Sequence, residues 1–158
     1  MGSWAAAAAG SGRFFSAAEM ALFDALSETI LPADEHSPGA RAAGVTAFVD
    51  AQLAEKDPKI LDWAEERKTA RDSLAALDGL CREMKGVSFT EASAADREAV
   101  LTRAAAAESD PKSPAEKAFK WLKGRTAYAY YTSKIGIHQE MEYKGNSLQV
   151  EYAGELPK

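Results

Sequence analysis

The chain has 158 residues, of which 46% are hydrophobic and 27% charged, and its formal net charge is −5. This composition is rich enough in apolar residues for a core and excludes disorder throughout the chain, and the length suits one domain. The excess of acidic residues argues against a general nucleic-acid surface, which needs clustered Lys and Arg. The sequence contains no apolar run of about 18 residues, so no transmembrane segment is predicted.

Residues 1–12 differ in composition from the rest of the chain. Residues 5–9 are all alanine, a Gly-Ser-Gly triplet follows, and no basic region precedes the alanines. Such a segment is typical of added or processed sequence rather than of a folded domain. We therefore expect residues 1–12 to be an expression leader or the remainder of a removed export signal, joined to a domain that begins near Arg13.

The first helix is predicted to begin after Ser16. Glu19 lies three positions later, which is the spacing of a capping box. Pro32 should end this helix, because its ring clashes with the preceding turn and its nitrogen has no hydrogen to donate. Residues 33–39 are rich in turn-forming residues and predict a loop. The expected buried face consists of Met20, Phe23, Leu26, Ile30 and Leu31.

A second helix is expected over residues 40–54 and a third over residues 58–84. Asp57 should cap the third helix, with Pro58 in its first turn and Gly86 after its end. In both helices the side chains expected to be buried recur at three or four positions. They are Val45, Phe48, Val49 and Leu53 in the second helix, and Ile60, Leu61, Trp63, Ala64, Leu74, Leu77, Leu80, Cys81 and Met84 in the third.

Two more helices are predicted in the second half of the chain. Ser93 with Asp96 marks the start of a fourth helix, although Thr90 could cap a slightly longer one. Residues 113–116, Ser-Pro-Ala-Glu, combine an N-cap, a proline in the first turn and a capping-box glutamate. These residues predict a fifth helix that ends near Ser133.

The predicted fold class is all-α. We expect a small bundle of about five helices over residues 13–134, followed by an extended, irregular C-terminal tail over residues 135–158. Glycines punctuate this tail, and its apolar residues show no convincing pair of strands. A long segment with little local structure of its own needs a surface to lie against.

No catalytic, cofactor-binding or metal-ligating set is predicted. Cys81 is the only cysteine, which excludes an internal disulfide and a cysteine-based metal site, and we expect it to be buried. His36 follows Asp34 and Glu35, but one short acidic loop is usually a solvated turn. His138 is expected at the surface or at an interface. The phosphate-binding glycine motifs, the Gly-x-Ser-x-Gly motif and the Cys-x-x-Cys-His motif are all absent from the sequence.

Tyr128, Tyr130 and Tyr131 crowd the end of the fifth helix. Neighbouring residues of a helix point about 100° apart, so the three rings cannot share one side. If Tyr128 and Tyr131 pack inward, Tyr130 points elsewhere. Tyrosine combines a large apolar ring with a hydroxyl, which suits protein interfaces. Two interpretations are open: all three tyrosines close the local core, or at least one faces a partner.

Two blocks of the sequence resemble the gluconate 2-dehydrogenase subunit 3 family, the small or gamma subunit of membrane-associated gluconate 2-dehydrogenase and its relatives. The first block runs from Phe23 to Asp50 and contains a Pro-Ala-Asp turn at residues 32–34 and a Pro-Gly-Ala sequence at residues 38–40. The second contains residues 130–133, Tyr-Tyr-Thr-Ser, then Gly136, then residues 141–146, Met-Glu-Tyr-Lys-Gly-Asn. The resemblance covers about residues 14–154.

The resemblance implies a noncatalytic small subunit that holds no cofactor itself. Its partner would be a large FAD-containing subunit of the glucose–methanol–choline type, which oxidises a sugar, glycoside, polyol or sugar acid and passes electrons to a cytochrome c or another acceptor. The tail over residues 135–158 would pack on this partner. The expected partner-binding residues are Tyr130, Tyr131, Thr132, Ser133, Tyr143, Gly145, Asn146 and Tyr152.

The resemblance also implies a periplasmic location. Small subunits of this family commonly carry a twin-arginine signal with which the folded large subunit is exported. No Arg-Arg pair precedes Arg13, so we expect that signal to have been removed or replaced. Members often have a cysteine after a C-terminal Tyr-x-Gly, whereas Glu155 follows Gly154 here, which argues against a tail disulfide.

Two other hypotheses remain from the sequence. The first is a stand-alone helical binding or adaptor domain, which would be a stable monomer with its tail folded back. The second is an autonomous enzyme, favoured only by the acidic loop at Asp34.

Overall fold

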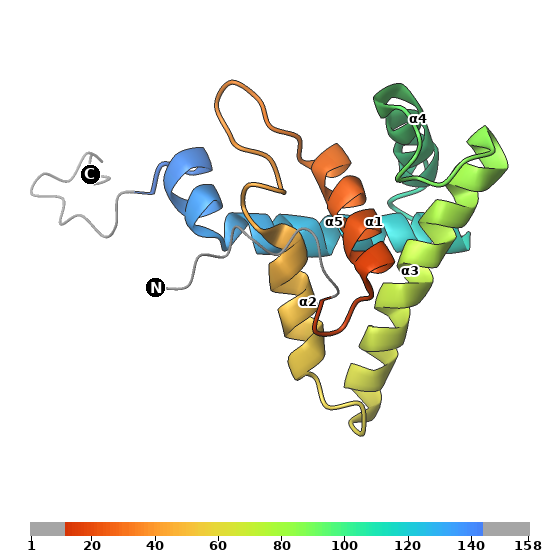
Figure 1. Ribbon diagram of the computed structural model, residues 1–158, viewed down its shortest axis with the longest axis horizontal. Coiled ribbons are helices and arrows are strands. Elements are labelled where there is room, and N and C mark those ends of the chain that lie inside the picture. The colour runs from red at the N-terminus through yellow and green to blue at the C-terminus, as the bar shows by residue number, and fades with distance from the viewer. Residues whose placement is uncertain (1–11, 144–158) are drawn as a thin grey trace, which may run out of the picture.

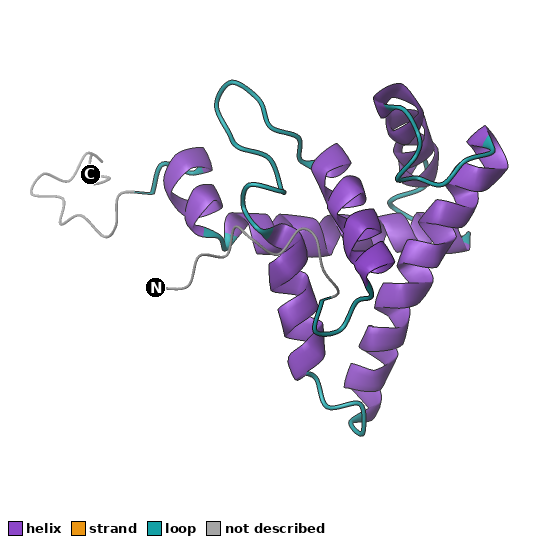
Figure 2. Ribbon diagram, viewed as in Figure 1, coloured by secondary structure: helices purple, strands orange, loops and turns teal. Residues whose placement is uncertain are grey.

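A computed structural model describes residues 12–143, which form helices and no strand (Figure 2). The α-helices are α1 (Ala17–Ile30), α2 (Val45–Glu55), α3 (Leu61–Lys85), α4 (Ala94–Ala105) and α5 (Pro114–Tyr131). A short π-helical segment, η2 (Gly136–Glu140), follows α5. The predicted all-α bundle is therefore confirmed, and residues 1–11 and 144–158 lie outside the described part of the chain.

Helix α5 is the centre of the arrangement. Figure 1 shows α2 and α3 converging at a tip, α1 lying between their wider ends, and α5 crossing behind them. Each of the other five helical segments contacts α5. None of the helices between residues 12 and 143 has both the length and the apolar character needed to cross a membrane.

The core is built from the apolar side chains that face this shared interior. Completely enclosed side chains come from all five α-helices and from Phe89 in the connection between α3 and α4; they include Phe23, Leu26, Val49, Leu74, Leu77, Val100 and Leu122. Cys81 is also enclosed, as predicted, and burial raises the pKa of its thiol.

The helix-start signals at Ser16, Ser93 and Ser113 are confirmed. Ser16 with Glu19, and Ser113 with Glu116, form complete capping boxes in which each side chain bonds the backbone N–H of the other residue. The Ser93 hydroxyl accepts a hydrogen bond from the backbone N–H of Asp96. These signals work because both partners lie within one turn of the same helix.

Two helices start later than predicted. Residues 40–44 form turns, and α2 begins after Gly44, whose φ of 70° is a left-handed conformation that ends the turn. Asp57 does not cap α3. Its carboxylate accepts a hydrogen bond from the backbone N–H of Lys59 (2.9 Å), so it closes a turn before the helix, and Ile60 takes the N-cap position.

The predicted buried side of α3 is wrong at both ends. Leu61 is 72% exposed and Trp63 39% exposed, Ile60 is exposed as well, and at the other end Met84 is exposed. The buried side begins only at Ala70. The start of α3 projects past α1 to the tip (Figure 1), and no element between residues 12 and 143 covers Ile60, Leu61 and Trp63 there.

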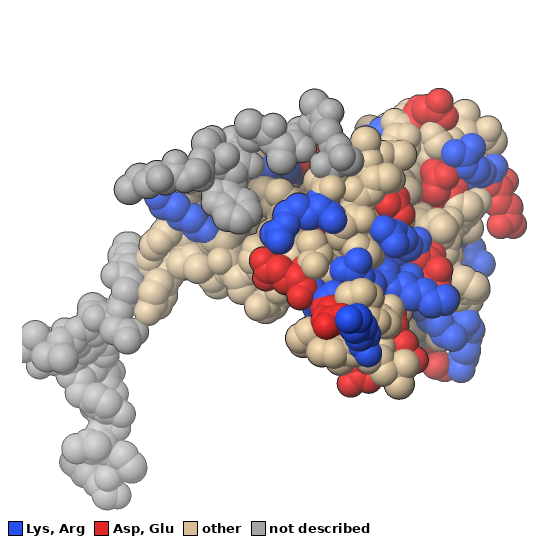
Figure 3. Space-filling model, turned by 60° about the horizontal axis from the view of Figure 1, so that its bottom comes forward, with Lys and Arg blue, Asp and Glu red and all other residues tan. Residues whose placement is uncertain are grey.

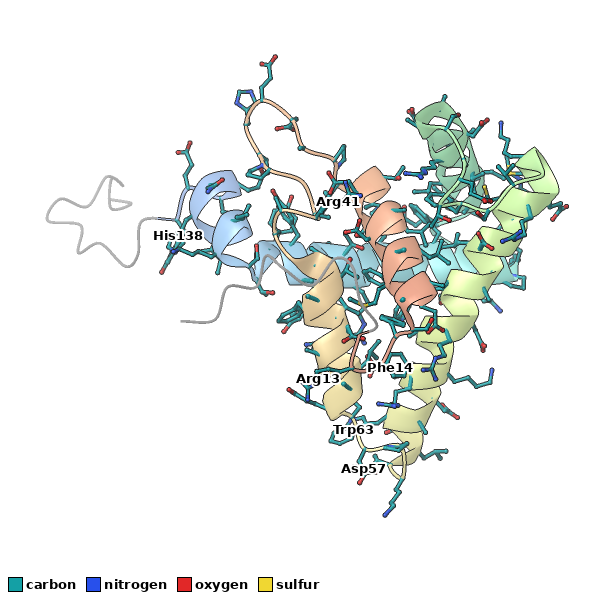
Figure 4. All side chains as sticks on the ribbon, in the orientation of Figure 1. Arg13, Phe14, Arg41, Asp57, Trp63 and His138 are labelled. Carbon is teal, nitrogen blue, oxygen red and sulfur yellow. The ribbon has the colours of Figure 1, made fainter. Side chains whose placement is uncertain are left out.

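The first described residues are fixed to the body of the fold by Asp50. The buried Asp50 carboxylate accepts hydrogen bonds from the backbone N–H groups of Arg13 (2.7 Å), Phe14 (3.0 Å) and Phe15 (2.7 Å). Figure 4 shows Arg13 and Phe14 beside α2 and α3. Gly12, the last residue of the expected leader, already donates a hydrogen bond to the carbonyl of Phe15 (2.8 Å). We refer to residues 12–15 as the N-terminal clasp.

Phe14 is held between two cations in this clasp. Its ring centroid lies 4.5 Å from the guanidinium carbon of Arg67 and 4.2 Å from that of Arg71. Arg71 also donates a hydrogen bond to the Phe14 carbonyl (2.8 Å), and Arg67 bonds the Leu53 carbonyl at the end of α2. The clasp therefore ties α2 to α3.

The expected extended tail is wrong for its first residues. Residues 134–140 are helical, and Ile135 packs against the core. Gly136 is buried, and a Cβ at this position would lie 2.8 Å from backbone atoms of Tyr130 and Tyr131. Only glycine allows this close approach, which turns the chain back onto α5 instead of letting it extend.

Candidate partner interface

Tyr130 is the residue that joins α5 to the loop between α1 and α2. Its side chain is 2% exposed, and its hydroxyl donates a hydrogen bond to the Pro38 carbonyl (2.8 Å) and bonds the Ser37 hydroxyl. Tyr128, in contrast, is 53% exposed, and Tyr131 is exposed too. Tyr130 is therefore the tyrosine that packs inward, and the interpretation that all three tyrosines close the local core is wrong.

The loop held by Tyr130 is also organised from within. One carboxylate oxygen of Asp34 accepts hydrogen bonds from the backbone N–H groups of His36 (2.8 Å) and Ser37 (2.7 Å), and these bonds lower the pKa of Asp34. The backbone N–H of Ala40 closes the loop on the Leu31 carbonyl (2.8 Å). Asp34 is thus a turn former, and between residues 12 and 143 no three His, Cys, Asp or Glu side chains are placed to share a metal ion.

The second half of the loop is fixed on α1. Glu28 accepts a hydrogen bond from the backbone N–H of Arg41 (2.7 Å), and the Arg41 guanidinium bonds Asp24 (2.8 Å). A Cβ on Gly39 would lie 2.5 Å from a Glu28 carboxylate oxygen and 2.6 Å from the Ala33 nitrogen. Glycine is favoured there because the Ala33 backbone of the same loop leaves no room for a Cβ, whereas the end of the Glu28 side chain could move aside.

The two sequence blocks that resemble one family therefore meet in space. Tyr130 of the second block and Pro38 of the first are 92 positions apart and share a hydrogen bond. Sequence reasoning missed this contact, because neither residue alone predicts a partner so far along the chain.

Thr132 and Ser133 have local backbone partners. The Thr132 hydroxyl donates a hydrogen bond to the Tyr128 carbonyl (2.7 Å), and the Ser133 hydroxyl accepts one from the backbone N–H of Gly136 (3.0 Å). Both side chains shape the passage from α5 to η2. Their contact with a partner remains a prediction.

Four exposed apolar side chains lie on the last turns of α5 and just after η2. Tyr128, Tyr131, Met141 and Tyr143 are all exposed, and the ring of Tyr128 lies 6.2 Å from the half-buried ring of Phe48 on α2. Tyrosine and methionine are enriched at the centres of protein interfaces. We call Tyr128, Tyr131, Met141 and Tyr143 the exit cluster, and it is the candidate interface.

The remaining predicted site residues can be placed only in part. His138 is exposed on η2 (Figure 4), and Gly145, Asn146 and Tyr152 lie outside the described residues. Sequence reasoning also missed a second exposed apolar group, Ile60, Leu61 and Trp63, because it assigned these residues to the core.

Replacing Tyr130 with phenylalanine should lower the free energy of unfolding by about 1–2 kcal/mol, because the Pro38 carbonyl and the Ser37 hydroxyl lose their buried partner. Urea denaturation measures this change. The matched control is Tyr131→Phe on the exposed neighbour, for which we expect a change below about 0.5 kcal/mol. Equal effects of the two substitutions would contradict the role assigned to the Tyr130 hydroxyl.

Comparison with known proteins identifies the family. The family model described as gluconate 2-dehydrogenase subunit 3 matches residues 17–147, from the start of α1 to beyond η2. A search of the curated proteins and a search of the solved structures each found no match to this chain. The match covers most of the chain and includes both blocks that Tyr130 joins, so the chain belongs to the gluconate 2-dehydrogenase subunit 3 family.

Proposed function

We propose that this chain is the noncatalytic small subunit of a periplasmic FAD-dependent dehydrogenase that acts on a sugar, a glycoside, gluconate or a polyol. Membership of the family makes the chain a small subunit of a dehydrogenase complex. The proposal adds that the partner is a large flavoprotein subunit of the glucose–methanol–choline type, and that this chain supports its folding, export and stability.

The observation that carries the proposal is the family match over residues 17–147. The exit cluster supports it, because four exposed apolar side chains lie on the last turns of α5 and just after η2. Hydride transfer to a flavin needs the bound flavin and a base beside the substrate alcohol, and we assign both to the large subunit. Electrons then leave for a cytochrome c or another acceptor.

Co-expression tests the supporting role. The large subunit is produced with and without this chain, and its soluble yield, its flavin content and its sugar-oxidising activity with an artificial electron acceptor are compared. We expect folded, flavin-loaded large subunit only when this chain is present. Equal yield and activity in both cultures would rule out the supporting role.

Export is tested with a signal on this chain alone. A twin-arginine signal is placed before residue 12, and the large subunit carries no signal. We expect the large subunit to reach the periplasm with this chain, and to stay in the cytoplasm when the two signal arginines are replaced by lysines. A large subunit that is exported equally well in both cases would refute export by association.

A further inference from the structure

The tip between α2 and α3 carries apolar side chains that the fold itself does not cover. Ile60, Leu61 and Trp63 are all exposed there, and Figure 4 shows Trp63 at the tip where the two helices converge. Trp63 is partly held by Lys56, whose ammonium nitrogen lies 5.9 Å from the centre of its ring. Three neighbouring exposed apolar side chains are more than the scattered single ones that an ordinary surface shows.

A chain of contacts connects this tip to the exit cluster. Both Lys56 and Arg125 form an ion pair with Glu66, and all three side chains are partly buried. Arg125 lies on α5 three positions before Tyr128, so the two side chains share one side of that helix. Tyr128 in turn contacts Phe48 on α2. We call the surface from Trp63 through Lys56, Glu66, Arg125 and Phe48 to Tyr128 the aromatic band.

We propose that the large dehydrogenase subunit binds along the whole aromatic band, with the α2–α3 tip as a second anchor beside the exit cluster. This inference rests on the proposed function, since it names the surface that the large subunit covers. The occupant is a protein surface with apolar pockets for Trp63 and Leu61 and an acidic or hydrogen-bond-accepting group opposite Lys56 and Arg125.

The position of the chain end favours this occupant. The described chain ends at Tyr143, which belongs to the exit cluster, and Tyr128 belongs to both the exit cluster and the aromatic band. A partner that covers the exit cluster therefore also covers one end of the band. A stable subunit interface is expected to bury roughly 2,000 Å² or more, which the exit cluster alone is too small to supply.

The chemistry of the band suits burial by a protein. Tryptophan, tyrosine and arginine are the residue types that contribute most to binding at interfaces. Lys56 and Arg125 share the single carboxylate of Glu66, so the band carries one net positive charge, and a partner that buries it must supply an acidic or hydrogen-bond-accepting group. Figure 3 turns the tip side forward and shows Lys and Arg interspersed with Asp and Glu, which disfavours an anionic lipid surface or a nucleic acid as the occupant.

The test measures dissociation of the copurified complex. The complex is diluted from micromolar to nanomolar concentration, and mass photometry gives the fraction dissociated and hence Kd. We expect Trp63→Ala to raise Kd about 30-fold or more, as for a central aromatic anchor, and Leu61→Lys to raise it about 10-fold or more. The melting temperature of the isolated small subunit should stay within about 3 °C of the unchanged protein, because both side chains are exposed.

Two matched controls lie at the other end of α3. Met84 and Val87 are each 39% exposed, the same as Trp63, but they lie away from the aromatic band. Met84→Ala and Val87→Lys should change Kd less than about threefold. A Kd unchanged by both tip variants would overturn the inference, and so would tip variants that weaken binding no more than these controls do.

The outcomes separate the inference from the proposed function. If the unchanged chain fails to copurify with the large subunit, the proposed function fails and the inference fails with it. If the unchanged chain forms the complex and the tip variants bind the large subunit as tightly as it does, the inference alone fails. A second copy of the chain is the other occupant: if the isolated chain dimerises and Trp63→Ala makes it monomeric, the tip is a self-association surface and the inference is overturned.

Discussion

Replacing Asp50 with alanine should lower the free energy of unfolding by about 4 kcal/mol. The substitution removes one buried carboxylate and leaves the backbone N–H groups of Arg13, Phe14 and Phe15 without their acceptor. Hydrogen bonds to a charged group contribute about 1.5–3 kcal/mol each, and a buried N–H without a partner costs about 1–3 kcal/mol. Urea denaturation of the chain measures the loss.

Glu55→Ala is the control for the Asp50 experiment. Glu55 lies on the same helix and also interacts with Arg13, at 3.5 Å, but both side chains of this pair are largely exposed to solvent. An exposed ion pair contributes about 0–1 kcal/mol, so the control should be nearly neutral. A loss for Asp50→Ala as small as that of the control would show that the clasp does not depend on this carboxylate.

Replacing Gly136 with alanine should lower the free energy of unfolding by about 2–3 kcal/mol. The new Cβ would lie 2.8 Å from the Tyr130 carbonyl carbon and from the Tyr131 Cα, and backbone atoms cannot move aside without disturbing the last turn of α5. We expect η2 to detach from α5. Hydrogen exchange should then lose protection at the backbone N–H groups of Met141 and Tyr143, which bond the carbonyls of Gly136 and Ile137.

Replacing Gly124 of α5 with alanine should have the opposite effect on the free energy of unfolding. Gly124 lies within α5, and a Cβ there would meet no atom within 4 Å. Alanine has the higher helix propensity, so this substitution should stabilise the chain by about 0.5–1 kcal/mol. If both glycine substitutions stabilised the chain, the close packing of η2 on α5 would be refuted.

The predictions that succeeded depend on residues close together in the sequence. Ser16 and Glu19, and Ser113 and Glu116, could be assigned as capping boxes because their partners lie within one turn. The fold class followed from such signals and from apolar spacing. The predicted all-α bundle is therefore the part of the structure that the sequence determines most directly.

The predictions that failed concern which side of a helix is covered. Apolar spacing correctly groups Ile60, Leu61 and Trp63 with one another, but it cannot say that no described helix covers these three side chains. The same limit left the burial of Tyr130 and Tyr131 open, although they are adjacent in the sequence and differ in burial. Only the position of the loop around Pro38, set by contacts far along the chain, decides which tyrosine lies inside.

The predicted partner-binding residues stay a prediction, and the structure gives only their exposure. The exposed side chains of Tyr131 and Tyr143 agree with a partner-binding role, which remains to be tested, whereas Tyr130 lies in the core of this chain. Asp50 was not singled out, although it interrupts the apolar side of α2 next to Val49. A carboxylate in that position indicates a bound group, but its partners lie 35–37 positions earlier.

The N-terminal clasp imposes an order on folding during synthesis. Residues 12–15 are made before their partners. Asp50 follows Phe15 by 35 positions, and Arg71 follows Phe14 by 57 positions. Contacts between residues so far apart form only after the intervening chain has been made. The start of the domain therefore becomes fixed only when α1, α2 and much of α3 are present. A segment attached before residue 12 would therefore be fixed to the folded domain only after that step. Docking of the clasp thus indicates that the first three helices have assembled.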